Sequence, residues 1–210
     1  MAAPIYCFCH CEKRTKIFYS NFPQWCPVCG LDTERSLSLI PPYKIPSPFI
    51  TVSQSPYSVV IRPTVGHFIE SYTASDNLHI GITSSTGEVY DYDENGLNIG
   101  SDVWKRTDCL SIAMPPHSAE ETTVTWDDSL RHYSQYPDWH QNRYHSDDHN
   151  CYDFVIGFFR YIRLASRDSR YASKISFTEN VLLPETTKVA AYISLYRKIQ
   201  QEGTVCQTSD

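Results

Sequence analysis

One cysteine stands where a thiol could do chemistry. Cys151 follows Asn150, a residue type that often caps helices, and Phe154 and Phe158 then recur at helical spacing. The cysteine is therefore expected in the first turn of a helix. There, exposed backbone N–H groups and the helix dipole favour a thiolate. A thiolate in such a place can act as a nucleophile on a carbonyl carbon.

A histidine far upstream is the candidate base. His79 lies in the alternating segment 78–84, which predicts a strand, and Gly81 would let a helix N-terminus approach that strand closely. Residues 85–87 suit a three-residue hairpin loop, which places Asp91 on the face of His79. A four-residue loop would shift the register and send Asp91 to the other face. In the first register Asp91 can orient His79 and stabilise its imidazolium.

Both residues also have a purely structural interpretation. Cys151 shares its helical stripe with two phenylalanines and could be an inert buried thiol. Asp147 and Asp148 suit a helix N-terminus but oppose a thiolate beside them. His79 could be an ordinary strand histidine with one polar neighbour. The choice between a catalytic pair and packing stays open on these residues alone.

The N-terminal cysteines form a second chemical group. Cys26 and Cys29 are two residues apart and Gly30 follows, a spacing typical of a knuckle whose sulfurs converge on one ion. We expect Cys11 as the third ligand of a structural zinc site. The fourth ligand comes from one of three nearby residues: His10, Cys9 or Cys7. The alternative is a set of ordinary buried thiols.

Composition limits the function classes. The 210 residues carry a formal net charge of -6, which argues against a nucleic-acid surface. We expect no signal peptide, because no apolar stretch follows a basic segment near residue 1, and the longest apolar run, 154–159, is too short to span a membrane. Five of the eight cysteines precede residue 30, which favours local metal binding over disulfides. We therefore expect an intracellular protein, cytoplasmic or nuclear.

The chain is predicted to have three parts: a zinc ribbon at 1–35, a proline-rich linker at 36–56 and an α+β domain at 57–206. Strands are expected at 58–62, 78–84, 88–93 and 109–114, and helices near 119–134, 150–166 and 185–201. Aromatic residues between Trp126 and Tyr144 predict a loop packed over the start of the Cys151 helix. Cys206 is expected in a frayed tail.

The second half of the chain resembles the permuted papain-like fold. A His-x-Gly-Ile strand, a hairpin return ending in a polar residue and a later Asn-Cys-Tyr helix start are similar to lecithin:retinol acyltransferase-like proteins and PPPDE deSUMOylating peptidases. The resemblance covers roughly residues 60–165. It implies a domain of the NlpC/P60-like type, with His79 as base, Cys151 as nucleophile and Asp91 as polar partner. Asp91 departs from the second histidine of the acyltransferase-like members.

Nearly the whole chain is similar to the makorin opposite-strand protein family. The matching stretches are His10-Cys11-Glu12-Lys13, Cys26-Pro27-x-Cys29, Leu78-His79-x-Gly81-Ile82-Thr83, His149-Asn150-Cys151-Tyr152 and Leu195-Tyr196-Arg197. This resemblance implies His10 and Cys11 as the first pair of metal ligands. It implies no particular activity.

Two functions follow as expectations. The first is a cysteine hydrolase or acyl-transfer enzyme acting on an amide, isopeptide or thioester carbonyl. The alternative is a non-catalytic adaptor, a pseudoenzyme whose zinc ribbon and aromatic loop bind another protein. Both imply a protein substrate or partner, and neither needs nucleic acid or a membrane.

Overall fold

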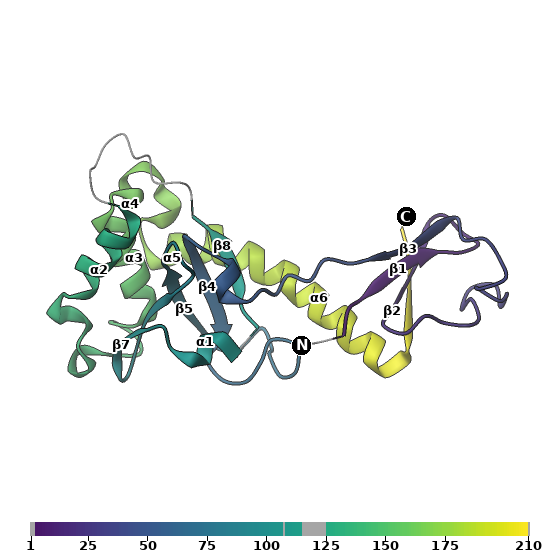
Figure 1. Cartoon of the computed structure of the whole chain (residues 1–210), viewed down its shortest axis with the longest axis horizontal. Helices are drawn as coiled ribbons and strands as arrows, with labels where there is room; N and C mark the ends of the chain where they lie inside the picture. The colour runs from purple at the N-terminus through teal and green to yellow at the C-terminus, as the bar shows by residue number, and fades with distance from the viewer. Residues whose placement is uncertain (1–2, 107, 115–124, 210) are drawn as a thin grey trace. The chain divides into compact units, whose positions relative to one another are not determined.

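The computed structural model describes residues 3–106, 108–114 and 125–209. The chain divides into two compact units (Figure 1). Unit 1 comprises Met1–Pro48 and Lys188–Asp210, and unit 2 comprises Phe49–Thr187. Helices accompany two antiparallel sheets, so the predicted α+β class is confirmed. In the described residues, no helix is long and apolar enough to cross a membrane.

Unit 1 is built on a four-stranded sheet in the order β3-β1-β2-β9 (Figure 1). Its strands are β1 (Tyr6–Cys9), β2 (Thr15–Tyr19), β3 (Ile40–Lys44) and β9 (Thr204–Thr208). Gly203, at a φ of 79°, ends helix α6 (Leu183–Glu202) and turns the chain into β9. Buried side chains then pack the sheet against that helix: Ile5, Cys7, Phe18, Ile199 and Val205.

Two segments of this sheet differ from the predicted organisation. The predicted linker at 36–56 contains β3, which pairs with β1. Pro41 and Pro42 fit there because an edge strand has one side free of ladder hydrogen bonds. The expected frayed tail is also wrong, since Cys206 lies on β9 opposite Ile17. Unit 1 therefore extends beyond 1–35, and it includes strand β9 and the part of α6 that follows Thr187.

Unit 2 contains a five-stranded antiparallel sheet in the order β7-β6-β5-β4-β8. Its strands are β4 (Ser58–Pro63), β5 (Leu78–Thr83), β6 (Val89–Asp93), β7 (Gly96–Ile99) and β8 (Leu110–Ala113). The four predicted strands are confirmed to within a residue at each end. Strand β7 was missed, although Asn95-Gly96 is a strong hairpin signal.

Helices of unit 2 gather beside this sheet (Figure 1), and α3 packs against β5 and β6. The helices are α1 (Asp102–Arg106), α2 (Trp126–Ser134), α3 (Cys151–Tyr161), α4 (Leu164–Arg167) and α5 (Lys174–Phe177). Single turns lie at Val52–Gln54, Pro137–Trp139, Gln141–Arg143 and Ser169–Tyr171, and a π-helical turn at Thr178–Leu182. The helix predicted near 119–134 is confirmed over residues 126–134, which form α2. Residues 119–124 lie outside the described residues. The helix predicted at 150–166 is interrupted at Arg163, which has a φ of 59°.

The start of α3 does approach β5, since Cys151 lies near His79 and α3 packs on that strand. At Gly81 itself, the three atoms nearest to an added Cβ belong to β6, and the nearest is Val89 Cγ1 at 2.7 Å. The close packing on α3 is at Gly157, where a Cβ would lie 2.0 Å from the Tyr133 hydroxyl. That hydroxyl donates a hydrogen bond to the Phe154 carbonyl at 3.2 Å, so it cannot move away freely.

Gly157→Ala is therefore expected to destabilise unit 2. The clash should cost about 1–3 kcal/mol, more than the roughly 1 kcal/mol that alanine gains over glycine in a helix. Chemical denaturation measures the free energy of unfolding. In a Tyr133→Phe background the hydroxyl is gone, and the same substitution should cost less. An equal cost in both backgrounds would contradict this packing.

Candidate functional site

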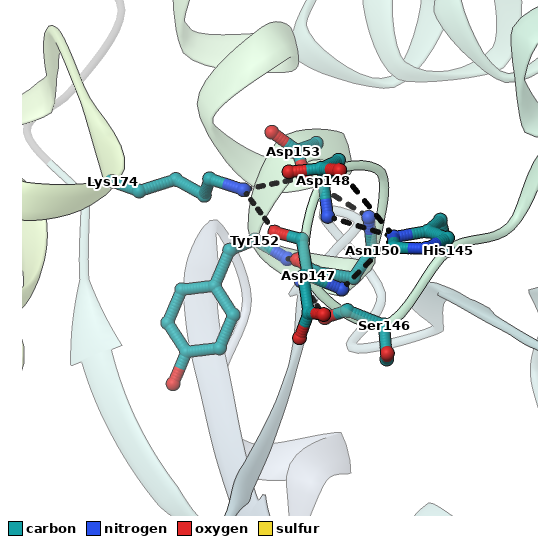
Figure 2. A network of polar contacts seen from close by, with 8 residues as sticks. All are labelled: His145, Ser146, Asp147, Asp148, Asn150, Tyr152, Asp153 and Lys174. Carbon is teal, nitrogen blue, oxygen red and sulfur yellow. Dashed lines mark hydrogen bonds and ion pairs between the residues drawn. The ribbon is translucent and has the colours of Figure 1, made fainter.

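Cys151 is the first residue of α3, as predicted, and a reciprocal cap fixes its place. The Asn150 side-chain oxygen accepts a hydrogen bond from the Tyr152 backbone N–H at 2.9 Å. The Asp153 carboxylate accepts one from the Asn150 backbone N–H at 2.9 Å. Lys174 of α5 binds the same carboxylate at 2.9 Å (Figure 2). This network holds the first turn of α3 in one geometry.

The two aspartates before the helix, Asp147 and Asp148, lie in an exposed turn. The Asp147 backbone carbonyl accepts a hydrogen bond from Lys174 at 3.1 Å (Figure 2). The Asp148 carboxylate lies 3.6 Å from His145 Nδ1. Because both carboxylates are exposed to water, screening weakens the opposition to a thiolate that the sequence predicts from these charges.

His79 and Asp91 form a buried hydrogen-bonded pair. Gly81 lies opposite Asp91 in the β5–β6 ladder, which confirms the predicted register. His79 Nε2 lies 2.7 Å from Asp91 Oδ2, and the two residues are only 7% and 2% exposed. Trp104 donates its indole N–H to the other carboxylate oxygen at 2.9 Å. Both oxygens of Asp91 therefore have defined partners.

The Cys151 thiol lies close enough to His79 to raise the pKa of the imidazole. Because Nε2 of the ring is bound to Asp91, the remaining nitrogen, Nδ1, is the one available to the thiol. Burial lowers the pKa of His79, but the hydrogen bonds to Asp91 and Cys151 outweigh it and raise that pKa to about 9. The raised pKa favours the imidazolium form of the ring at neutral pH.

Cys151 begins the apolar stripe of α3, and the phenylalanines of that stripe pack against other rings. Phe154 packs against Trp139 with ring centroids 5.1 Å apart, and Phe158 packs against Trp126, also at 5.1 Å. Those rings form the core between α3 and the elements around it, while the thiol lies near an imidazole. Cys151 is 6% exposed, so little of the residue is open to solvent.

Aromatic side chains of the preceding loop pack beside the start of α3. His149 stacks on Trp139 at 5.1 Å, and Tyr92 contacts both Trp139 and Tyr144. Burial raises the pKa of the Tyr144 hydroxyl, and the charge of the nearby Cys151 raises it further. The predicted aromatic loop is confirmed, and the His149 ring donates to the Asp138 carbonyl at 2.9 Å. Among the residues that the structure describes, His149 belongs to no group of side chains that could hold a metal ion.

Unit 1 brings together four side chains that could hold a metal ion. The ligand atoms of His10, Cys11, Cys26 and Cys29 all lie within 4.8 Å of one another. Gly30, at a φ of 73°, closes the knuckle by donating its backbone N–H to the Cys26 carbonyl at 2.8 Å. One nitrogen and three sulfurs at this spacing fit a tetrahedral ion.

The surroundings of this cluster select His10 as the fourth member. Its Nδ1 lies 3.3 Å from the Cys29 sulfur, and its Nε2 is 2.6 Å from the Ser36 hydroxyl. That second bond orients the ring toward the cluster, as the outer partner of a metal-bound histidine does. Cys7 and Cys9 are buried in the unit and lie outside the cluster, which removes the other two alternatives.

The structure therefore defines an α+β protein with a Cys/His cluster in one unit and a buried Cys–His–Asp group in the other. Residues 3–32 match the family described as DUF4796 N-terminal, and residues 42–199 match DUF4796 C-terminal. The MKRN2 opposite strand protein of Homo sapiens is 32% identical over 196 residues, which cover 93% of this chain and 86% of the human protein. The chain belongs to this makorin opposite-strand family, as the sequence motifs predict. No solved structure matches it.

One residue of the thiol group could not be found from sequence. Trp104 reaches Asp91 from α1, a five-residue helix with no amphipathic pattern long enough to detect. Its only signal was a tryptophan in a polar stretch, which requires a partner for its N–H if it is buried.

Proposed function

We propose that the chain is a cysteine hydrolase or acyl-transfer enzyme built on a permuted papain-like domain. The observation that carries the proposal is the contact between Cys151, at the start of a capped helix, and His79, held by a buried Asp91. Nucleophile, base and orienting carboxylate form a connected set, which is the pattern of an activated nucleophile. The substrate class is an amide, isopeptide or thioester.

In the proposed reaction His79 holds the proton of the Cys151 thiol, and the thiolate attacks the substrate carbonyl carbon. The C–O double bond opens to an oxyanion, which backbone N–H groups at the start of α3 stabilise. His79 then returns its proton to the leaving amine or thiol as the tetrahedral intermediate collapses to a thioester on Cys151. Water or another acceptor attacks that thioester, gives a proton to His79, and frees the thiol.

Unit 1 is proposed to hold a structural zinc ion. His10, Cys11, Cys26 and Cys29 would occupy all four positions of a tetrahedral site, which leaves no position for a substrate. Bound zinc would fix the knuckle, in a segment with few other means of ordering it. Zinc therefore has no role in the carbonyl chemistry proposed for unit 2.

A second candidate function is a non-catalytic adaptor that binds another protein. Its support is the limited access to Cys151 and a set of exposed apolar side chains in unit 1: Trp25, Leu31, Leu37 and Leu39. Scattered exposed apolar residues are common on protein surfaces, so this support is weaker than a connected thiol group.

Acylation by p-nitrophenyl acetate separates the two functions. The enzyme should release a burst of p-nitrophenol, form an acetyl thioester on Cys151 and then turn over slowly. Cys151→Ala should lose the burst, whereas Cys206→Ala, which removes an exposed thiol on β9, should keep it. Peptide mass spectrometry locates the acetyl group. If the folded wild-type protein carries no acetyl group on Cys151, the enzyme proposal fails and the adaptor function is favoured.

A further inference from the structure

We propose that Trp104 is a positioning residue for the Cys151 chemistry, acting on His79 through Asp91. This inference rests on the proposed function and extends it to α1, which lies outside the Cys151, His79 and Asp91 set. It assigns the indole N–H, rather than the bulk of the ring, as the group that matters.

The first argument is the completed coordination of the carboxylate. Asp91 accepts from Trp104 Nε1 at Oδ1, 2.9 Å away, and bonds His79 Nε2 at Oδ2, 2.7 Å away. A buried carboxylate held at one oxygen can rotate about its side-chain bonds, but one held at both cannot rotate without breaking a bond. Trp104 therefore fixes the direction in which Asp91 meets His79.

The second argument is the position of the ring. Trp104 is 1% exposed, and its ring centroid lies 5.7 Å from that of His79 at an angle of 30°. The indole thus covers the imidazole and helps keep water from the His79–Asp91 bond, which strengthens that bond. The Arg62 guanidinium carbon lies 5.2 Å from the centroid of the same ring, and Arg62 is the register partner of His79 in the β4–β5 ladder.

Apolar packing places the indole and leaves its N–H for Asp91. Trp104 belongs to a buried cluster with side chains from neighbouring elements: Val52, Val60, Val89 and Cys109. Phenylalanine could fill most of this space, but it carries no N–H donor. Apolar packing alone therefore gives no reason for a tryptophan here, whereas the bond to Asp91 does.

Trp104→Phe in the full-length chain tests the proposal. Loss of the N–H leaves Asp91 Oδ1 without its donor, and acylation of Cys151 by p-nitrophenyl acetate should slow about tenfold. Loss of the N–H changes both the direction and the basicity of the Asp91 carboxylate, so the pKa of His79 should shift from its wild-type value in a histidine NMR titration. The charged or titrating groups that face His79 are Asp91 from β6, Cys151 from α3 and Arg62 from β4.

Trp126→Phe is the matched control. Trp126 is also buried and also donates its indole N–H, at 3.0 Å to the Thr83 carbonyl, but it has no contact with Asp91. It should lose comparable stability and keep both the acylation rate and the pKa of His79. The proposal is overturned if the two variants behave alike, or if Trp104→Phe leaves the pKa of His79 unchanged.

A wild-type measurement covers the case in which the variant does not fold. The Trp104 indole N–H resonance should titrate with the same midpoint as the His79 ring, because Asp91 connects them. An indole signal that ignores the ionisation of His79 would overturn the proposal. Neither NMR readout needs enzymatic activity, so failure of the acylation assay in the wild type would count against the proposed function alone.

Discussion

His79→Ala is expected to slow the acylation of Cys151 by about 10²–10⁴-fold, the range that a positioned base contributes. The variant removes the group that receives the thiol proton and returns it to the leaving group. Rates of p-nitrophenol release, with mass spectrometry of the Cys151 peptide, measure the effect. Because the acetyl donor is small, limited access to the sulfur should affect both proteins equally.

A second histidine provides the control for that result. His145 lies in the turn before α3, near Asp148 (Figure 2). It is not the histidine that we pair with Cys151. His145→Ala should acylate at close to the wild-type rate. Equal rates for wild type, His79→Ala and His145→Ala would mean that Cys151 reacts as an ordinary thiol, and the enzyme proposal would fail.

Cys26→Ser is expected to remove the metal from unit 1 and to unfold its knuckle. Metal binding to structural zinc sites of this kind is worth about 10–16 kcal/mol, which is available only in the folded state. Elemental analysis gives the metal content, and amide hydrogen exchange in β1 and β2 reports the loss of order. Chelation of the wild-type protein should produce the same change.

Cys206→Ser tests whether that effect belongs to the cluster. Cys206 is an exposed cysteine in the same unit, on β9, but lies outside the four proposed ligands. It should keep one metal ion per chain and wild-type protection in β1. A wild-type protein whose exchange does not change on chelation would contradict a structural metal site.

The sequence predicted the parts of the thiol group that depend on local rules. Alternation in β5, a short loop and alternation in β6 were sufficient to place Asp91 beside His79, because hairpin register follows from loop length. Asn150 was sufficient to place Cys151 at a helix start. The contact between Cys151 and His79 could not be predicted from these local rules, because it depends on how α3 packs on the sheet.

Apart from strand β7, the features that the sequence did not predict depend on distant pairing. Strand β9 joins β2 from the far end of the chain, so no local pattern distinguishes it from a tail. Strand β3 is a proline-containing edge strand, whose composition is that of a linker. Trp104 acts through one hydrogen bond across the fold, and a single buried donor has no periodicity to detect.

The ionisation of His79 tests the central claim most directly, because it shows whether the Cys151 sulfur faces the imidazole. An NMR titration of the histidine rings should find His79 protonated at neutral pH, with its pKa raised to about 9. In Cys151→Ala the pKa of His79 should fall, since the bond to the thiol helps to raise it. A His79 pKa near its ordinary value of 6.5, unchanged by Cys151→Ala, would contradict the account.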